Sequence, residues 1–314
     1  MAMKTALVLG ATGGVGGAVT RAMLARGWRV VALVRNPARA AAAWGASIAP
    51  DRQAGDAMDR ADVVRAAHGT DVIVHAVNPP GYRGWDRLVL PMLDNTLAAA
   101  RDAGARIVLP GTVYNYDPAL APVIDETVPQ HPRGRKGAIR VEMERRLAEA
   151  APEVRSLIVR AGDFFGPGAG QSWFAQALSK PPLARIVNPG TPGVGHAWAY
   201  LPDLAEAILR LLELPPERLM PCERLQFPGH YDADGAQMVA AIRRASGRPN
   251  LPERRFPWAL MRGLALFGGF PREVMEVRPF WAHAMRLDGS RLTELLGDVP
   301  CTSLNAAISA ALRS

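Results

Sequence analysis

The chain has 314 residues, of which 49% are hydrophobic and 21% are charged. This balance supplies a large core and excludes a wholly disordered protein, and the length predicts two domains or one large domain with a second lobe. The net charge of +8 permits an anionic partner, for which a phosphorylated cofactor is as good a candidate as DNA. Cys222 and Cys301 are too few for a disulfide framework, and the cysteines and histidines lack metal-ligand spacing, so we expect no metal.

No apolar run is long enough for a membrane-spanning helix, and glycines interrupt the apolar stretch after Lys4, unlike a secretory signal. We therefore expect a cytoplasmic protein without a membrane partner. The most apolar stretch of the second half, residues 256–270, is short and contains Arg262, so we expect a packed helix there.

The first half of the chain alternates strand-like and helix-like segments. Short apolar runs predict strands over residues 5–10, 29–35, 71–77, 106–110 and 154–162, with a weak one near 47–49. Amphipathic stretches predict helices over residues 14–27, 59–68, 86–103, 137–150 and 203–213, the last with Asp203 as its N-cap. This order predicts an α/β fold, a Rossmann-type doubly wound parallel sheet with helices on both faces.

The sequence G-A-T-G-G-V-G at residues 10–16 directly follows a predicted strand and opens a predicted helix. Glycines let the backbone turn tightly and approach a pyrophosphate, to which the helix N-terminus offers free N–H groups. We therefore predict a dinucleotide site made by Gly10, Thr12, Gly13, Gly14, Val15 and Gly16.

The end of the second predicted strand distinguishes between cofactors. An acidic residue there would bind the ribose of NAD, but this chain has Arg35 and Asn36, with Arg39 close behind. A guanidinium is always charged and can bind a 2′-phosphate through two hydrogen bonds. We therefore favour NADP as cofactor over NAD.

Further motifs follow in order along the chain. They are A-G-D at 54–56, H-A-V-N at 75–78, V-R-A-G-D-F-F-G-P-G at 159–168, Y-L-P-D-L-A at 200–205 and L-D-G-S-R-L-T-E-L-L-G at 287–297. Together with the Gly-x-x-Gly-x-x-Gly spacing, they resemble the short-chain dehydrogenase/reductase superfamily, in particular its extended branch, the NAD-dependent epimerase/dehydratase family. The resemblance implies that the cofactor also contacts Asp56, Ala76, Val77, Asn78, Lys136 and Ala161.

The same resemblance implies catalysis by a serine, a tyrosine and a lysine, but this sequence differs at all three places. L-P-G-T-V-Y-N at 109–115 has Pro110 in the serine place. K-G-A-I-R-V-E-M-E at 136–144 has Lys136 in the tyrosine place and Arg140 in the lysine place. We therefore expect an atypical member of the superfamily.

Several side chains could take over the missing chemistry. Lys136 could donate the proton in place of the tyrosine, because a buried ammonium beside other cations gives up a proton more readily. Alternatively, Lys136 and Arg140 hold ribose hydroxyls, bind an anionic substrate group or pair with Glu144. Tyr116 is a second candidate donor, and Thr112 supplies the hydroxyl nearest to the missing serine.

After Gly166, clusters of proline and glycine separate shorter elements, which indicates a smaller C-terminal substrate lobe. We assign residues 1–165, with parts of 185–215, to the NAD(P)-binding domain and residues 166–314 mainly to this lobe. The candidate substrate-binding residues are Tyr114, Asp163, Phe164, Trp173 and His196.

The pattern as a whole favours an NAD(P)-dependent oxidoreductase or epimerase-like enzyme acting on an unknown small substrate, with anionic or nucleotide-sugar-like compounds as candidates. The alternative is a non-catalytic NADP-binding redox sensor or regulatory protein, since all three catalytic residues are replaced. Glutamates interleave the basic residues of 133–146, so we do not expect nucleic-acid binding. Apolar faces on 86–103 and 137–150 fit a homodimer or a monomer equally.

Overall fold

The computed structural model describes residues 3–42, 44, 49–79 and 84–313. Contacts within the chain divide it into two units, each assembled from three segments. The first unit contains Met1–Gly111, Ile139–Val159 and Ala205–Leu225. The second unit contains Thr112–Ala138, Arg160–Leu204 and Gln226–Ser314.

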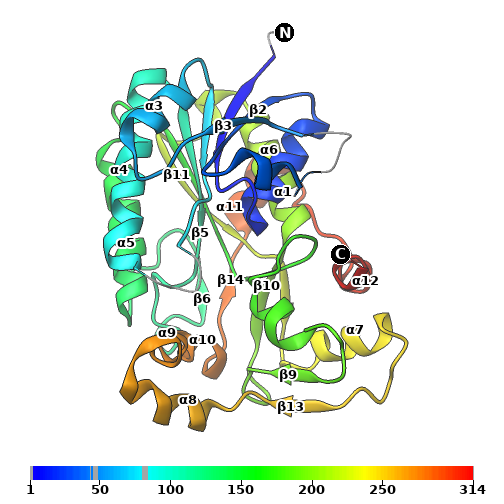
Figure 1. Ribbon diagram of the computed structural model, residues 1–314. Coiled ribbons are helices and arrows are strands. Elements are labelled where there is room, and N and C mark those ends of the chain that lie inside the picture. The colour runs from blue at the N-terminus through cyan, green and yellow to red at the C-terminus, as the bar shows by residue number, and fades with distance from the viewer. Residues whose placement is uncertain (1–2, 43, 45–48, 80–83, 314) are drawn as a thin grey trace. The chain divides into compact units, whose positions relative to one another are not determined.

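In the described part of the chain, a seven-stranded sheet has the order β11-β7-β5-β4-β1-β2-β3 (Figure 1). Its strands are β1 (Thr5–Leu9), β2 (Arg29–Val34), β3 (Asp51–Ala54), β4 (Val72–His75), β5 (Arg106–Gly111), β7 (Ser156–Ala161) and β11 (Cys222–Phe227). The neighbours β1–β2, β1–β4, β2–β3 and β4–β5 pair in parallel. The predicted Rossmann-type α/β fold is therefore confirmed. The weak strand predicted near 47–49 falls largely on residues outside the described ranges.

Helices cover both faces of this sheet (Figure 1). One face is covered by α3 (Arg60–Ala67), α4 (Trp85–Ala103) and α5 (Arg135–Glu149). The other face is covered by α1 (Gly14–Ala25) and α6 (Leu201–Glu213). The short helix α2 spans Pro37–Ala42. The apolar faces of α4 and α5 lie in one core with alternate strand residues, through Leu93, Leu97, Ile139, Met143 and Leu147. These side chains therefore stabilise the first unit itself, and their apolar pattern is no evidence for a dimer.

The N-terminus of α6 differs from the prediction. The helix begins at Leu201, so Asp203 lies in its first turn and is not its N-cap. The Asp203 carboxylate instead accepts hydrogen bonds from Thr302 N and Thr302 Oγ1, both at 2.7 Å. This buried carboxylate fixes the segment that leads into α12 (Leu304–Arg313).

The second unit contains three small sheets among its described residues, with the orders β12-β10-β8, β13-β9 and β14-β6. Their strands are β6 (Val123–Ile124), β8 (Asp163–Phe165), β9 (Ile186–Asn188), β10 (His196–Tyr200), β12 (His230–Asp232), β13 (Glu253–Arg255) and β14 (Arg286–Leu287). Its helices are η2 (Phe174–Leu178), α7 (Gln237–Ala245), α8 (Trp258–Leu264), η4 (Ala265–Phe267), α9 (Gly269–Val277), α10 (Pro279–Ala282), α11 (Ser290–Leu296) and α12, whereas η3 (Pro216–Arg218) belongs to the first unit.

The packed helix expected over residues 256–270 is wrong. Two short helices, α8 and η4, and the beginning of α9 occupy this stretch, and the side chains at its tip face solvent: Leu266 is 87% exposed and Phe267 is 88% exposed. Of the helices in the described ranges, none combines the length and apolar character needed to cross a membrane.

His75, the last residue of β4, is a buried histidine in the core of the first unit. Its Nδ1 lies 2.8 Å from Thr96 Oγ1, and that hydroxyl donates to the Met92 carbonyl at 3.0 Å, so Nδ1 carries the proton that Thr96 accepts. Burial, and after it the positive charge of Arg140, lowers the pKa of His75 to about 3. His75 is therefore a neutral imidazole at neutral pH.

This histidine predicts a pH dependence of stability. The unfolded chain binds a proton at His75 below about pH 6.5, whereas the folded chain does not until about pH 3, so the free energy of unfolding falls as the pH falls between these values. One such group contributes at most about 1.4 kcal/mol per pH unit. In the His75→Asn variant the amide can still donate to Thr96. We expect the free energy of unfolding of this variant, measured by urea denaturation between about pH 7 and about pH 5, to depend less steeply on pH, by up to about 1.4 kcal/mol per pH unit.

The control is His68→Asn, which changes an exposed histidine just after α3. It should keep the pH dependence of the wild type. If His75→Asn kept that dependence as well, the buried neutral state of His75 would be refuted.

Candidate functional site

The glycine loop between β1 and α1 has no room for side chains at two positions. Gly10 has a φ of +87°, and a Cβ there would lie 2.5 Å from the Ala76 carbonyl oxygen. A Cβ at Gly16 would lie 2.3 Å from the Gly10 carbonyl oxygen. Gly13 N donates to Gly10 O at 2.9 Å and closes the turn. The loop backbone therefore packs directly on the residue that follows β4, and only glycine fits at both contact points.

The N-terminus of α1 opens toward solvent at this loop. No side chain caps the helix at Gly13, and its first turn contains no acidic residue. The N–H groups of Gly14, Val15 and Gly16 lie in the first turn, where a helix has no carbonyl of its own to satisfy them. Thr12 and Gly13 are exposed, so an anion can approach. The loop residues thus fit the pyrophosphate of a dinucleotide.

The remaining residues predicted for the cofactor in the first unit follow the ends of neighbouring strands. Arg35 is exposed immediately after β2, and Ala76, Val77 and Asn78 follow β4, while β2 and β4 flank β1. Because parallel strands end at the same edge, these residues share that edge with the glycine loop. Ala161, the last residue of β7, is buried and belongs to the second unit.

Asp56 lies in a turn that hydrogen bonds hold in place. Its backbone N donates to Asp62 Oδ2 at 2.9 Å, and its Oδ1 accepts from Met58 N at 3.0 Å. The hydrogen bond from Asp56 N, followed by one from Arg65, lowers the pKa of Asp62. A rigid turn of this kind presents the Asp56 side chain in one fixed direction.

Lys136 is 1% exposed at the beginning of α5 and binds two carboxylates of α9. Its ammonium donates to Glu276 Oε2 at 2.8 Å and to Glu273 Oε2, and its backbone N donates to Glu276 Oε1 at 2.6 Å. Arg135 also pairs with Glu273, at 2.8 Å. Burial opposes ionisation of Glu273, but the hydrogen bonds and charges of Lys136 and Arg135 outweigh it and lower the pKa of that carboxyl. The ammonium thus ties the first turn of α5 to α9, and the alternative pairing of Lys136 with Glu144 stays a prediction.

Arg140, the residue in the lysine place, is buried within the first unit. Its guanidinium carbon lies 5.1 Å from the centre of the Trp85 ring, within cation–π distance. Glu144, one turn further along α5, is 2% exposed, and its Oε2 lies 4.0 Å from Arg224 Nε. The face of α5 that carries Lys136, Arg140 and Glu144 is therefore buried along its length and is not a solvated surface.

The hydroxyl residues after β5 all belong to the second unit. Thr112 Oγ1 accepts from Tyr114 N at 3.3 Å, and the Tyr114 ring lies 5.1 Å from that of Phe280. Tyr116 is 1% exposed in an apolar cluster, with the Arg160 guanidinium carbon 5.6 Å from its ring centre. Neither contact set identifies a proton donor, so the catalytic roles of Thr112 and Tyr116 stay predictions.

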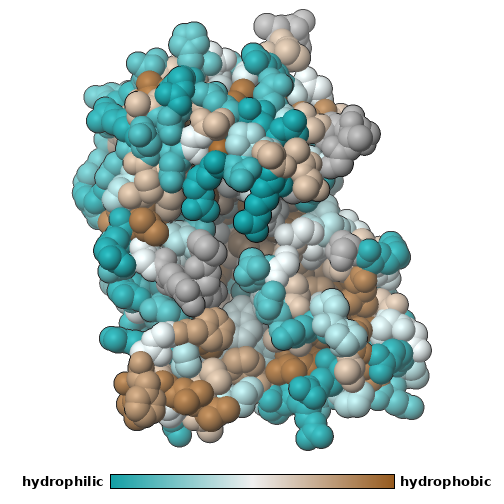
Figure 2. All heavy atoms as spheres, viewed as in Figure 1, coloured by the Kyte–Doolittle hydropathy of each residue, from teal (hydrophilic) through white to brown (hydrophobic). Residues whose placement is uncertain are grey.

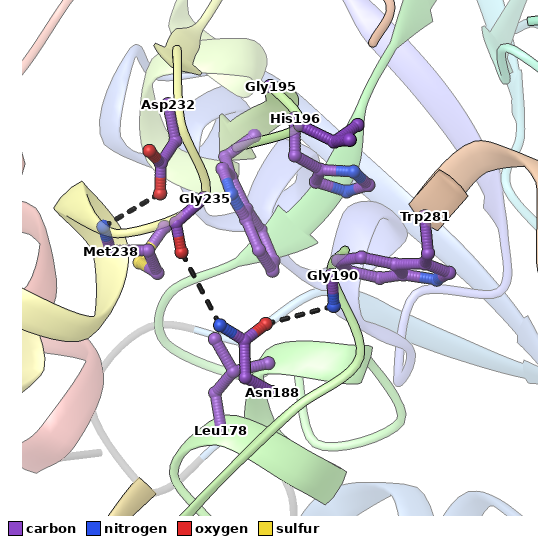
Figure 3. A pocket seen from close by; sticks show the side chains of 11 residues that line it. Leu178, Asn188, Gly190, Gly195, His196, Asp232, Gly235, Met238 and Trp281 are labelled. Carbon is purple, nitrogen blue, oxygen red and sulfur yellow. Dashed lines mark hydrogen bonds between the residues drawn. The ribbon is translucent and has the colours of Figure 1, made fainter. Parts of the chain in front are cut away.

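Asp163 and His196, two of the predicted substrate residues, lie in contact. His196 Nε2 is 2.8 Å from Asp163 Oδ2, and His196 Nδ1 is 3.2 Å from the Phe280 carbonyl oxygen. The imidazole stacks on Trp281, with ring centres 3.8 Å apart and planes 7° from parallel (Figure 3). Both ring nitrogens therefore lie within hydrogen-bond distance of an oxygen that can accept.

Aromatic side chains surround this pair. Trp173, also predicted, has its ring 5.5 Å from that of Trp281, and Phe164 lies opposite Ala199 in the register of β8 with β10. A cavity of about 10 Å³ lies beside His196 and Trp281 (Figure 3), which is room for about one water molecule. As it stands, this cavity is too small for a substrate.

Glu273, Glu276, Trp281 and Arg160 are functional candidates that the sequence analysis missed. Glu273 and Glu276 have a usable signal, because residues three apart lie on one face of a helix. Their partner Lys136 is more than a hundred residues away in the chain, and no sequence pattern connects the two. Among the side chains of the described ranges, no three His, Cys, Asp or Glu residues gather as ligands of a metal would.

Comparisons with known proteins agree with this geometry. The model of a family described as NAD(P)H-binding matches residues 10–140. The 3-diazoavenalumate denitrifying reductase of a Streptomyces species is 32% identical over 271 residues, which cover 81% of this chain and 84% of that protein. Sterol demethylase protein B of Methylococcus capsulatus is 28% identical over 338 aligned positions, which cover 98% and 97% of the two chains.

Among solved structures, UDP-glucose 4-epimerase from Bifidobacterium longum, in complex with NAD⁺ and UDP, superposes with a TM-score of 0.74. It is 18% identical, and the match covers 98% of this chain and 97% of the epimerase, so the likeness shows the fold. The resemblance inferred from the sequence motifs is confirmed. The chain belongs to the NAD(P)H-binding family and has the fold of NAD-dependent epimerases.

Proposed function

We propose that this protein is a reductase that prefers NADP(H) and acts on a small organic substrate. The observation that carries the proposal is the glycine loop, whose backbone has no room for a Cβ at Gly10 or Gly16 and which lies at the same sheet edge as Arg35. The N–H groups of the first turn of α1 would hold the pyrophosphate, and Arg35 would bind the 2′-phosphate. When bound, the nicotinamide supplies or accepts the hydride.

The replaced tyrosine supports reduction of an electron-poor group over epimerisation of a sugar. Hydride can add to a cationic or strongly polarised carbon without a proton donor at the acceptor atom, whereas oxidation of a sugar hydroxyl needs a base for its proton. One relative is named a denitrifying reductase of a diazo compound. In the diazonium form of such a compound, hydride can form a C–H bond at the carbon while the C–N bond breaks and N₂ leaves with its electron pair. We therefore propose hydride transfer that needs no proton from the tyrosine place, with Lys136 as a positioning residue.

Aromatic side chains of the second unit favour a substrate with flat apolar rings. The ring centre of Trp281 lies 5.5 Å from that of Trp173 and 5.7 Å from that of Trp198. Trp281 also stacks on His196, which contacts Asp163. Such a set binds apolar rings and offers one polar pair for orientation. Two relatives are named after a diazoavenalumate and a sterol, and the superposed epimerase was solved with UDP. We favour an apolar cyclic substrate over a nucleotide sugar.

The cofactor part of the proposal is tested by binding of NADPH and NADH. Removing Arg35 deletes a charge-assisted contact of about 1.5–3 kcal/mol, so Arg35→Ala should weaken NADPH binding by at least about tenfold and leave NADH binding nearly unchanged. Nicotinamide fluorescence during titration of the purified protein measures both affinities.

Arg29→Ala is the matched control, because Arg29 is the exposed arginine at the opposite end of the same strand. It should bind NADPH like the wild type. Equal affinities of the wild type for the two nucleotides would refute the 2′-phosphate contact, and a wild type that bound neither would refute the cofactor site.

The reductase part is tested by oxidation of NADPH, followed by absorbance, with three classes of acceptor: aryl diazonium salts, steroid ketones and UDP-4-keto-sugars. We expect turnover with aryl diazonium salts, in which hydride replaces N₂ and no proton is needed at the acceptor atom. Turnover with either class of ketone alone would contradict a transfer without a proton donor, and turnover with UDP-4-keto-sugars alone would favour epimerase-like chemistry. Tight NADPH binding without oxidation by any class would favour the non-catalytic sensor.

The role of Lys136 is tested by separating stability from turnover. Lys136→Met leaves two half-buried carboxylates without their ammonium, and we expect a loss of about 3 kcal/mol in the free energy of unfolding, measured by urea denaturation. Adding Glu276→Gln removes one of the two carboxylate charges, and Glu273 keeps its ion pair with Arg135. The double variant should therefore recover much of the stability, and its turnover should recover in parallel.

A double variant that is stable but inactive would contradict this positioning role and would make Lys136 a catalytic residue. Lys136→Arg completes the comparison, because it keeps the charge and replaces the ammonium by a guanidinium. Partial stability and partial turnover in that variant are the expected result.

A further inference from the structure

Five large apolar side chains near the tip of the α8–η4–α9 segment face solvent. The exposed fractions are 57% for Leu260, 40% for Leu264, 87% for Leu266, 88% for Phe267 and 57% for Phe270, and we call this group the apolar patch. Figure 2 shows hydrophobic spheres gathered where Figure 1 places α8 and α9. Single exposed apolar residues are ordinary, but a contiguous group within eleven residues marks an interaction surface.

The local structure presents these side chains on a short helical projection. Gly268 and Gly269 have φ values of +79° and +66°, so the backbone reverses between η4 and α9, and α8 packs against α9. Trp258 anchors the other end, since its Nε1 donates to the Pro189 carbonyl at 2.8 Å and its ring lies 5.9 Å from that of Trp173. The base of the projection is therefore fixed in the second unit, and the tip points its apolar residues outward.

The charged side chains within residues 254–272, the stretch that carries the apolar patch, are all positive. From residue 254 to residue 272 every charged side chain is an arginine, and Arg254, Arg262 and Arg272 are exposed. The nearest acidic residues of α9, Glu273 and Glu276, bind Lys136 and Arg135. The patch thus has a rim of arginines, and neither α8 nor η4 contains a carboxylate that would neutralise them.

We propose that the apolar patch docks peripherally on an anionic phospholipid surface. Leu266, Phe267 and Phe270 would enter the boundary between headgroups and acyl chains, while the arginines bind lipid phosphates, as on amphipathic segments that lie in the membrane plane. A second copy of the chain fits less well, because a symmetric contact would bring the two arginine rims together. The proposal differs from the expectation of no membrane partner, which assumed that residues 256–270 pack inside the protein.

Co-sedimentation with vesicles tests this proposal without cofactor or substrate. The full chain should sediment with vesicles of phosphatidylcholine and phosphatidylglycerol in roughly equal parts, and at least about tenfold more weakly with phosphatidylcholine alone. The double variant Leu266→Ser, Phe267→Ser should lose at least about tenfold in affinity for the anionic vesicles, and Arg262→Ala with Arg272→Ala should lose a comparable amount and most of the salt dependence.

Leu120→Ser is the control, because Leu120 is 75% exposed in the second unit but lies outside the apolar patch. It should bind the anionic vesicles like the wild type. Thermal unfolding shows whether each variant is folded, and all the changed side chains are at the surface. No sedimentation of the wild type, or sedimentation that the patch variants do not alter, would overturn the proposal. A wild-type dimer in light scattering that the Leu266 and Phe267 changes convert to a monomer would assign the patch to self-association instead.

Discussion

A tight steric constraint in the first unit lies within the glycine loop and where its backbone meets the residue after β4. At Gly10 and Gly16 a single added carbon would lie within 2.5 Å of a carbonyl oxygen, so the loop, α1 and β4 hold one another in a fixed arrangement. Everything at this sheet edge depends on that contact. It sets where the first turn of α1 begins, and with it which N–H groups face outward and how far Arg35 lies from them along the edge.

Electrostatics organises the second unit in a different way. Lys136, which the sequence motifs align with the family's tyrosine, holds two glutamates of α9 through its ammonium. The same two carboxylates would otherwise stand beside the arginine-rimmed tip of the projection. This lysine therefore helps to determine where α9 lies and which charges surround it.

The fold could be predicted from the sequence because its signals are local. The apolar runs over residues 5–10 and 71–77 contain β1 and β4 and extend one or two residues beyond them, and the glycine loop lies between a strand and a helix as expected. The helix over 86–103 was predicted to within one residue at its N-terminus. Such features depend on neighbours within a turn or two, which a sequence displays directly.

The contacts of the candidate site could not be predicted in the same way. Lys136 and Glu276 are 140 residues apart, and Asp203 and Thr302 are 99 apart, so nothing local connects them. The prediction of a packed helix over residues 256–270 was wrong for another reason. Apolar content indicates burial in an average protein, but here two adjacent glycines with positive φ turn the chain outward. His75 and Trp281 were overlooked because their importance lies in burial and stacking, which require the partner ring or hydroxyl to be known.

The interleaving of the two units has a consequence for how the chain is made. The backbone passes between the units five times, and the segment that completes the first unit ends at Leu225. The outermost strand on one side of the sheet, β11, comes from that last segment. During synthesis, neither unit can be completed until more than two thirds of the chain has left the ribosome. Until then one edge of β7 lacks its neighbouring strand, β11. No single cut in the chain would release either unit as an intact fragment.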